Sequence, residues 1–505
     1  MYTTPKPGRT GRGRVTSALA KDRLGVPAVT YFAVSMGSPL LATAGVITTG
    51  YAITGQVGIP IGFVVMAAVL ALFCVGYVTM APYVPNAGAF NAYVSKGLGR
   101  PAGVAAGWMA LLSYNAMQVG LYGALGDAAK PLLQAWFGVD IAWWVIALIG
   151  WAVVAVLGMQ HIDLNGKVLA VLLAAEVLVI LVYAISSLFH PAEGGPSFAA
   201  LEPSHLFEPG VGALLALALL AFIGFETAVV FSEEARSPGR TVPVATFVAL
   251  GVMSVLYLLA SLAMSVAAGP ANIGAMAHEH GSGLVFHLAG EQLGPVMVGI
   301  GRFLYFTSVL ACMIAVHNTA ARYAFAMGRE RVLPAVFGRT SHRNSSPKIG
   351  SISQSALGLA VIVVYAVIGG DPLRDLFYLW NSAGALGILI LLTLTSITVL
   401  VFFARNPSRE PLFRRVVAPA ISSVCTVIAL VLVLINLDKV FDLPASSPVL
   451  LAIPGAYVLI AVLGLLWGLH LRAHKPDIYA NIGLGAKSAA RTGLGLGLGS
   501  SEEQQ

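Results

Sequence analysis

Charge is the scarcest property of this chain. Lys, Arg, Asp and Glu make up 10% of its 505 residues, whereas a typical soluble domain carries about 25%. Hydrophobic residues make up 57% of the chain, and the mean hydropathy is +0.84. So few polar side chains cannot cover the surface of a water-soluble globule of this size. The composition therefore excludes a soluble protein and predicts an integral membrane protein that has lipid as its solvent.

Cysteine is also rare, and the common catalytic motifs are missing. Cys74, Cys312 and Cys425 all fall in apolar stretches, and their spacing fits neither a disulfide framework nor a metal site. Residues 485–488 lack the spacing of a phosphate-binding loop, and residues 278–280 lack that of a zinc-protease motif. We therefore expect no enzyme activity, no cofactor and no structural metal.

Long apolar runs fill most of the sequence. A helix needs about 20 apolar residues to cross a bilayer, and about twelve stretches qualify. They are residues 27–50, 60–82, 101–126, 141–159, 167–189, 209–232, 243–268, 293–327, 350–369, 375–404, 416–436 and 448–471. We expect an all-α fold with one transmembrane domain at 27–472, a cytoplasmic tail at 1–26 and another at 473–505. The repeat GLGLGLG predicts disorder in the second tail.

The basic residues are distributed unevenly between the two sides of this arrangement. With a cytoplasmic N-terminus, all but four of the 29 Lys and Arg residues fall on the cytoplasmic side. The exceptions are Lys130, Arg302, Arg374 and Lys439. This asymmetry follows the positive-inside rule and predicts a protein of the cell membrane with both termini in the cytoplasm. It also accounts for the net charge of +7 without a nucleic-acid partner.

Two of the predicted spans contain a break. Residues 211–243 run apolar up to Phe222-Ile223-Gly224-Phe225-Glu226 and then become polar. A carboxylate inside an apolar span is costly and is therefore a functional candidate. The first span has a matching polar break, with the sequence SMGSP at residues 35–39.

The two breaks lie five spans apart, so the second half of the chain has the opposite orientation to the first. The predicted inverted repeats cover residues 27–189 and 209–404, and the last two spans fall outside them. Amphipathic segments at residues 83–100 and 269–293 occupy matching positions on opposite sides. Broken helices at corresponding positions of two inverted halves indicate a binding site at mid-membrane.

Three motifs together resemble the amino acid–polyamine–organocation superfamily of secondary transporters. They are GFETAVVFSEEARSPGRTVPVA at the sixth span, PNAGAFNAY followed by GLG near residue 85, and NTAAR with AMGRE and LP near residue 320. The likeness covers about residues 27–405. It implies a five-plus-five inverted repeat with two additional C-terminal helices. The first-span motif, SMGSPLL, departs from the commoner glycine-rich form and resembles a branch with a proline at the break.

The breaks predict how a substrate would bind. Freed N–H groups at a half-helix N-terminus attract anions, so Gly37 and Ser38 are expected to hold a substrate carboxylate. Carbonyl groups freed before Gly224 would accept from an amino group, and Phe222 or Phe225 would act as a gate. Frequent Gly and Pro in membrane helices are the alternative explanation. The predicted binding set is Ser35, Gly37, Ser38, Pro39, Ala221, Phe222, Ile223, Gly224, Phe225, Asn115 and Asn381.

Two buried carboxylates are candidates for proton coupling. Burial raises a carboxylate's pKa, which would let Glu226 exchange a proton near neutral pH. Glu176 lies mid-span, close to where some proton-coupled relatives carry a lysine. Both residues could instead serve as hydrogen-bonding partners between helices. The resemblance also makes Thr307 and Ser308 weak candidates for a sodium site.

We interpret the sequence as a secondary active transporter for an amino acid or a related amine, working by alternating access and favouring protons as the coupling ion. A polyamine carrier or an amino acid exchanger of the same fold remains an alternative. A channel would need a continuous polar stripe, and the sequence has none.

Overall fold

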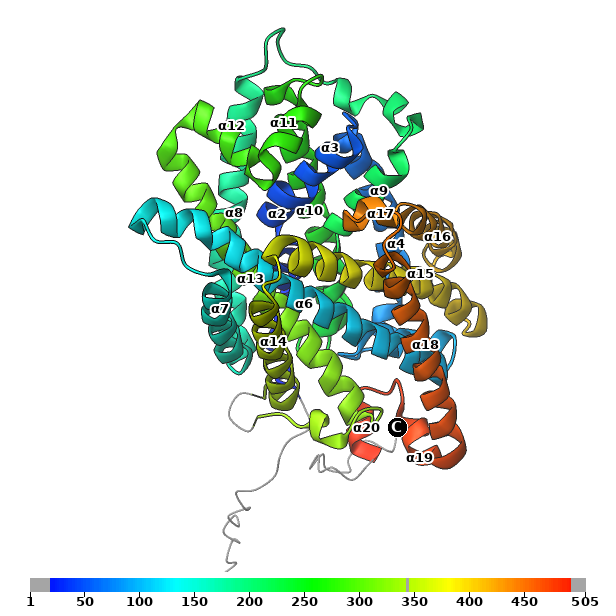
Figure 1. Ribbon diagram of the computed structural model, residues 1–505. Helices are drawn as coiled ribbons and strands as arrows, with labels where there is room; N and C mark the ends of the chain where they lie inside the picture. The colour runs from blue at the N-terminus through cyan, green and yellow to red at the C-terminus, as the bar shows by residue number, and fades with distance from the viewer. Residues whose placement is uncertain (1–18, 342–344, 492–505) are drawn as a thin grey trace, which may run out of the picture.

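Helices build nearly all of this protein. The computed structural model describes residues 19–341 and 345–491. Within these ranges the only extended pairing is a single bridge between Leu24 and Ala235. The predicted all-α fold is therefore confirmed (Figure 1).

Ten segments are long and apolar enough to cross a bilayer. They are Val26–Thr54, Ile59–Tyr83, Ile162–Phe189, Val211–Phe231, Pro238–Ala268, Pro295–Arg329, Lys348–Ile368, Pro372–Arg405, Phe413–Ile435 and Val449–His474. The two remaining predicted spans correspond to α6 (Arg100–Phe137) and the shorter α7 (Trp143–Gly158). The protein is thus a multi-pass membrane protein.

Most spans are single helices, and short helices connect them. Besides α6 and α7, the unbroken long helices are α4 (Ile59–Met80), α8 (Ile162–Phe189), α10 (Pro238–Ala268), α13 (Pro295–Arg329), α14 (Lys348–Ile368), α15 (Leu379–Arg405), α16 (Ala418–Ile435) and α18 (Val449–His474). The short ones are α5 (Ala89–Gly97), α11 (Ile273–His280), α12 (Leu284–Leu293), α17 (Leu437–Phe441), α19 (Pro476–Asn481) and α20 (Ala486–Arg491).

The first and sixth spans are broken where the sequence predicts. Span one consists of α1 (Val26–Gly37), α2 (Pro39–Leu41), a π-type turn and α3 (Thr48–Thr54). Span six consists of α9 (Val211–Ala221) and the 3-10 helix η5 (Phe225–Phe231). These spans are also the most enclosed: in their most apolar windows 83% and 89% of residues are buried, against 17% for α18. The broken helices therefore form the centre of the molecule.

The two ends of the molecule carry different elements. We call the end that holds Leu19 and α20 the terminal face, because both contribute to one cavity there. Helices α11 and α12 lie at the opposite end (Figure 1). The predicted amphipathic segments thus become α5, whose Lys96 lines the cavity of the terminal face, and α11–α12 on the opposite face.

The C-terminal segment differs from its prediction. Disorder was expected from residue 473 onward, but α19 and α20 are ordered helices on the terminal face. Ile482, between them, is 1% exposed and packs in a cluster with Val104, Met327 and Leu471. The apolar side chain of Ile482 was the available sequence signal for this packing, and the glycine-rich composition around it obscured that signal. The GLGLGLG repeat and residues 1–18 lie outside the described residues.

Candidate functional site

The two helix breaks touch each other through their backbones. Ser38 has a left-handed conformation, with φ of 47°, and separates α1 from α2. Gly224, between α9 and η5, has φ of 135°. A Cβ atom on Gly224 would lie 2.6 Å from the amide nitrogen of Gly37 and 2.9 Å from the carbonyl oxygen of Ala33. Only glycine fits such an approach, so the space between the breaks is closed in this conformation.

A carboxylate from another helix caps the break in span one. Glu176, in α8, is 1% exposed. Its Oε1 atom accepts a hydrogen bond from the Leu40 amide at 2.5 Å and another from the Ser308 hydroxyl at 2.7 Å. The Ser308 hydroxyl also lies 2.7 Å from that of Ser38. The half-helix N-terminus that was expected to attract a substrate carboxylate thus already holds the Glu176 carboxylate.

A carboxylate of the same segment caps the break in span six. The Gly224 amide donates to Oε2 of Glu226 at 2.7 Å. The Tyr114 hydroxyl, from α6, donates to Oε1 at 3.2 Å. The backbone carbonyl of Glu226 accepts from the Tyr77 hydroxyl at 3.0 Å. Glu226 therefore joins its own break to two tyrosines on neighbouring spans.

Neither carboxylate has a cationic partner in the described part of the chain. None of the ion pairs between described residues, with nitrogen and oxygen up to 4.0 Å apart, includes Glu176 or Glu226. Both side chains are buried and hydrogen-bonded. A buried charge without a counter-ion is expensive. Such a group can gain or lose a proton in response to small structural changes, or attract a cationic substrate.

Aromatic side chains pack around the breaks. Phe222 contacts Phe63 and Tyr257, with ring centroids 5.9 and 5.4 Å apart. Phe225 packs edge-on against Phe73 at 5.9 Å. The Tyr257 hydroxyl donates to the Gly37 carbonyl oxygen at 3.1 Å. The two predicted gate residues are thus packed into an aromatic layer of spans two, six and seven.

The other predicted binding residues have different surroundings. Ser35 is 1% exposed, and its hydroxyl has no hydrogen-bond partner in residues 19–341 and 345–491. Asn115 donates to the Leu111 carbonyl of its own helix, so its amide stabilises α6 locally. Asn381 lines a cavity of about 50 Å³ with Thr49. The remaining members, Pro39, Ala221 and Ile223, are buried at the breaks.

The two sodium-site candidates behave differently. The Ser308 hydroxyl takes part in the Glu176 network at the first break. The Thr307 hydroxyl donates to the Leu304 carbonyl within its own helix at 3.0 Å. Only Ser308 is therefore connected to the breaks.

Two buried ion pairs close the terminal face below span six. The Arg322 guanidinium donates to both carboxylate oxygens of Glu234, at 2.6 and 3.0 Å. Arg329 forms the same two-fold contact with Glu233, at 2.7 and 2.6 Å. Burial raises the pKa of Glu233, but the Arg329 charge and the Ala87 amide outweigh it and hold that pKa below its usual range. The pair thus stays charged at neutral pH.

Sequence reasoning missed the partners of these acids. Glu233 and Glu234 were recognised as a polar exit, and both arginines lie within a motif near residue 320. The available signal for the ion pairs was the spacing of Arg322 and Arg329, which lie seven positions apart on one face of a helix. The roles of Tyr77 and Tyr114 had no such signal, because their contacts cross between helices.

Comparison with known proteins agrees with this architecture. A sequence model of the family described as amino acid permease matches residues 28–463. The chain belongs to the amino acid permease family. It is a secondary transporter and not an enzyme.

Its relatives are transporters with different named substrates. The branched-chain amino acid permease BcaP of Bacillus subtilis (strain 168) is 24% identical over 420 residues, which cover 78% of this chain and 86% of BcaP. The methylthioribose transporter of the same organism is 26% identical, covering 76% and 83%. The low-affinity putrescine importer PlaP of Escherichia coli (strain K12) is 23% identical, covering 55% and 61%.

Proposed function

We propose that this permease moves an amino acid or a related amine across the cell membrane, coupled to protons. The observation that carries the proposal is the pair of buried carboxylates, Glu176 and Glu226, one at each helix break. Each accepts hydrogen bonds from a break and from a neighbouring span, so its protonation would change how firmly the spans are joined. A proton shifts the equilibrium between two conformations when it binds more tightly to one of them than to the other.

Alternating access follows from the same contacts. Spans one, two, six and seven would rock against spans three, four, eight and nine, with the two breaks at the pivot. Opening the terminal face would require Glu233 and Glu234 to leave Arg329 and Arg322. Breaking a buried pair costs about 3–5 kcal/mol. Substrate binding at the breaks would have to offset this cost.

We propose that the terminal face is cytoplasmic. The positive-inside distribution of Lys and Arg supports this orientation. In a Cys-free background, a cysteine at Ser282 on the opposite face should react with an impermeant thiol reagent from outside the cell. A cysteine at Ser345 should react only after the membrane is opened. Reaction of both from the same side would overturn the orientation.

A specific observation favours an amine as the recognised group. The half-helix N-terminus at Leu40 is occupied by Glu176, and both groups facing the breaks are carboxylates. Two buried carboxylates attract the ammonium group of a substrate, whereas they repel a substrate's carboxylate. A putrescine importer among the relatives is consistent with a diamine or polyamine substrate. We keep this as the second candidate function.

The test is uptake by purified protein in liposomes after a thermal-shift screen. A ligand of the folded state raises the unfolding temperature, so the screen selects among amino acids and diamines. With the outside at lower pH, the selected compound should accumulate above its equilibrium level, and a proton ionophore should abolish accumulation. Accumulation that persists with the ionophore and requires sodium would contradict proton coupling. Stabilisation by diamines alone would favour the second candidate.

A further inference from the structure

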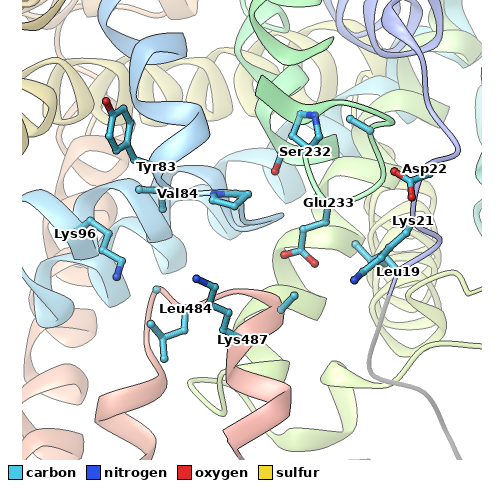
Figure 2. A pocket seen from close by; sticks show the side chains of 15 residues that line it. Leu19, Lys21, Asp22, Tyr83, Val84, Lys96, Ser232, Glu233, Leu484 and Lys487 are labelled. Atoms are coloured by element: carbon cyan, nitrogen blue, oxygen red, sulfur yellow. The ribbon is translucent and has the colours of Figure 1, made fainter. Parts of the chain in front are cut away.

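The terminal face contains a cavity that the transport site does not include. It has a volume of about 350 Å³. Its walls come from the segment before α1, residues 83–85 together with Lys96 of α5, the exit of span six, and the C-terminal segment at residues 483–487 (Figure 2). It therefore lies where four separate parts of the chain meet.

Three lysines from different segments line this cavity. They are Lys21 before α1, Lys96 on α5 and Lys487 on α20. Figure 2 shows the ammonium groups of Lys96 and Lys487 turned toward the same gap. In the ion pairs of the described residues, none of the three lies within 4.0 Å of a carboxylate. Like charges directed into one space repel each other unless an anion lies between them.

The acidic residues of the cavity do not balance these charges. Glu233 already forms a two-fold ion pair with Arg329 and accepts from the Ala87 amide. Lys21 adds to the field that lowers its pKa, but Arg329 contributes more. Asp22 is the remaining carboxylate in the lining. The cavity thus has an excess of positive charge.

A buried hydroxyl in this cavity also lacks a partner within the described part of the chain. Ser232 lines the cavity and is 1% exposed, yet its Oγ atom has no hydrogen-bond partner among the residues that the structure describes. A buried polar group left unpaired is unfavourable, because it has lost its hydrogen bonds to water without gaining others. Ser232 follows directly after η5, so its hydroxyl offers a hydrogen bond to a ligand from the end of span six.

We propose that this cavity binds a phosphate monoester or a similar dianion. Lysine ammonium groups act as point charges for phosphate, and the hydroxyl supplies one directed hydrogen bond. The volume lies at the small end of ligand pockets, which fits a phosphate group with a small organic substituent. The source is either a soluble phosphorylated metabolite or the headgroup of an anionic lipid, which the test separates.

The cavity also joins parts of the protein that would move relative to each other. Lys21 and Ser232 belong to the ends of spans one and six. Lys487 belongs to a segment whose Gly483 and Gly485 amides each donate to the buried Glu330 of span eight at 3.0 Å. A bound dianion would connect both sides and stabilise the closed terminal face. This regulatory consequence rests on the proposed transport cycle, but the binding itself does not.

Binding is tested on purified full-length protein without transport. One arm titrates inorganic pyrophosphate into protein in a neutral detergent by calorimetry. The other compares thermal unfolding in nanodiscs of phosphatidylcholine with and without phosphatidic acid. Three variants each remove one charged or polar group from the lining of the cavity: Lys96→Gln, Lys487→Gln and Ser232→Ala. Lys475→Gln is the matched control, because Lys475 is an exposed lysine of the same face outside the cavity.

We expect saturable binding in at least one arm, weakened about tenfold by Lys96→Gln or Lys487→Gln and unchanged in Lys475→Gln. Binding of pyrophosphate supports a soluble ligand, and stabilisation by phosphatidic acid alone supports a lipid headgroup. Absence of binding in both arms would overturn the proposal. An equal loss in the Lys475 variant would overturn it too, because binding would then be non-specific. A failure of the transport test leaves these binding results standing.

Discussion

The two helix breaks are capped in different ways. In span six the cap is Glu226, two residues from the Gly224 amide that it accepts from, so break and cap belong to one segment. In span one the cap is Glu176, which lies 136 residues away on α8 and also holds Ser308 of α13. A local cap moves with its own helix. A cap from another helix must be made or broken when the helices move apart.

This difference assigns separate tasks to the two carboxylates. Glu176, on span five, joins span one to span eight, and these two spans belong to opposite moving bodies in the proposed cycle. Glu226 mainly holds the shape of its own break through the Gly224 amide at 2.7 Å, and its one side-chain bond to the opposite body is the longer one from Tyr114 of span three, at 3.2 Å. We therefore expect protonation of Glu176, more than of Glu226, to bias the conformations. The sequence favoured Glu226 because it sits directly in the break motif.

The largest expected effect tests the backbone contact between the breaks. Gly224→Ala should lower the free energy of unfolding by about 3 kcal/mol, because φ is 135° and the new methyl group would meet the Gly37 amide. Gly37→Ala should cost about 1 kcal/mol, since its methyl group meets the end of the flexible Met253 side chain. Thermal and urea unfolding in detergent measure both.

The control shortens the obstructing side chain. Adding Met253→Ala should reduce the extra cost of Gly37→Ala but leave that of Gly224→Ala unchanged, because a backbone atom cannot move aside. Equal costs for the two glycines would show that the breaks are not in direct contact.

The next effect tests the caps themselves. Glu176→Gln should reduce uptake driven by a pH gradient by about tenfold or more and flatten its pH dependence, while exchange between equal substrate pools persists. The amide keeps a hydrogen-bond acceptor for Leu40 but has no charge to neutralise. Glu226→Gln should change the pH dependence less. Both are measured in proteoliposomes with the outside acidified.

The reverse ranking would contradict the comparison. If Glu226→Gln alone flattened the pH profile, the local cap would be the coupling group. If neither variant changed the profile, protons would not be coupled through these carboxylates, and sodium or exchange would explain accumulation.

Local patterns predicted much of this structure, and long-range pairings were beyond them. The spans and both breaks follow from apolar runs interrupted by Gly37, Pro39 and Gly224, which are properties of short windows of sequence. That Glu176 reaches Leu40 depends on how α8 packs beside span one, which no window contains. The ordered segment around Ile482 was missed for the same reason.

The smallest expected effect concerns the hydroxyl that completes the cap of span one. Ser308 bonds Glu176 and Ser38 at once, so Ser308→Ala removes two contacts between spans one, five and eight. It should lower the free energy of unfolding by about 1–2 kcal/mol, because buried partners lose a donor. Thr307→Ala, its neighbour, removes only a bond to Leu304 within α13 and should cost less than about 0.5 kcal/mol. The same denaturation assay compares them, and Ser308→Thr, which keeps the hydroxyl, should recover part of the loss.

If the two alanine variants were equally stable, Ser308 would not connect the spans. The cap would then consist of Glu176 and the Leu40 amide alone. We would then expect Glu176→Gln and Glu226→Gln to differ less in the pH dependence of uptake.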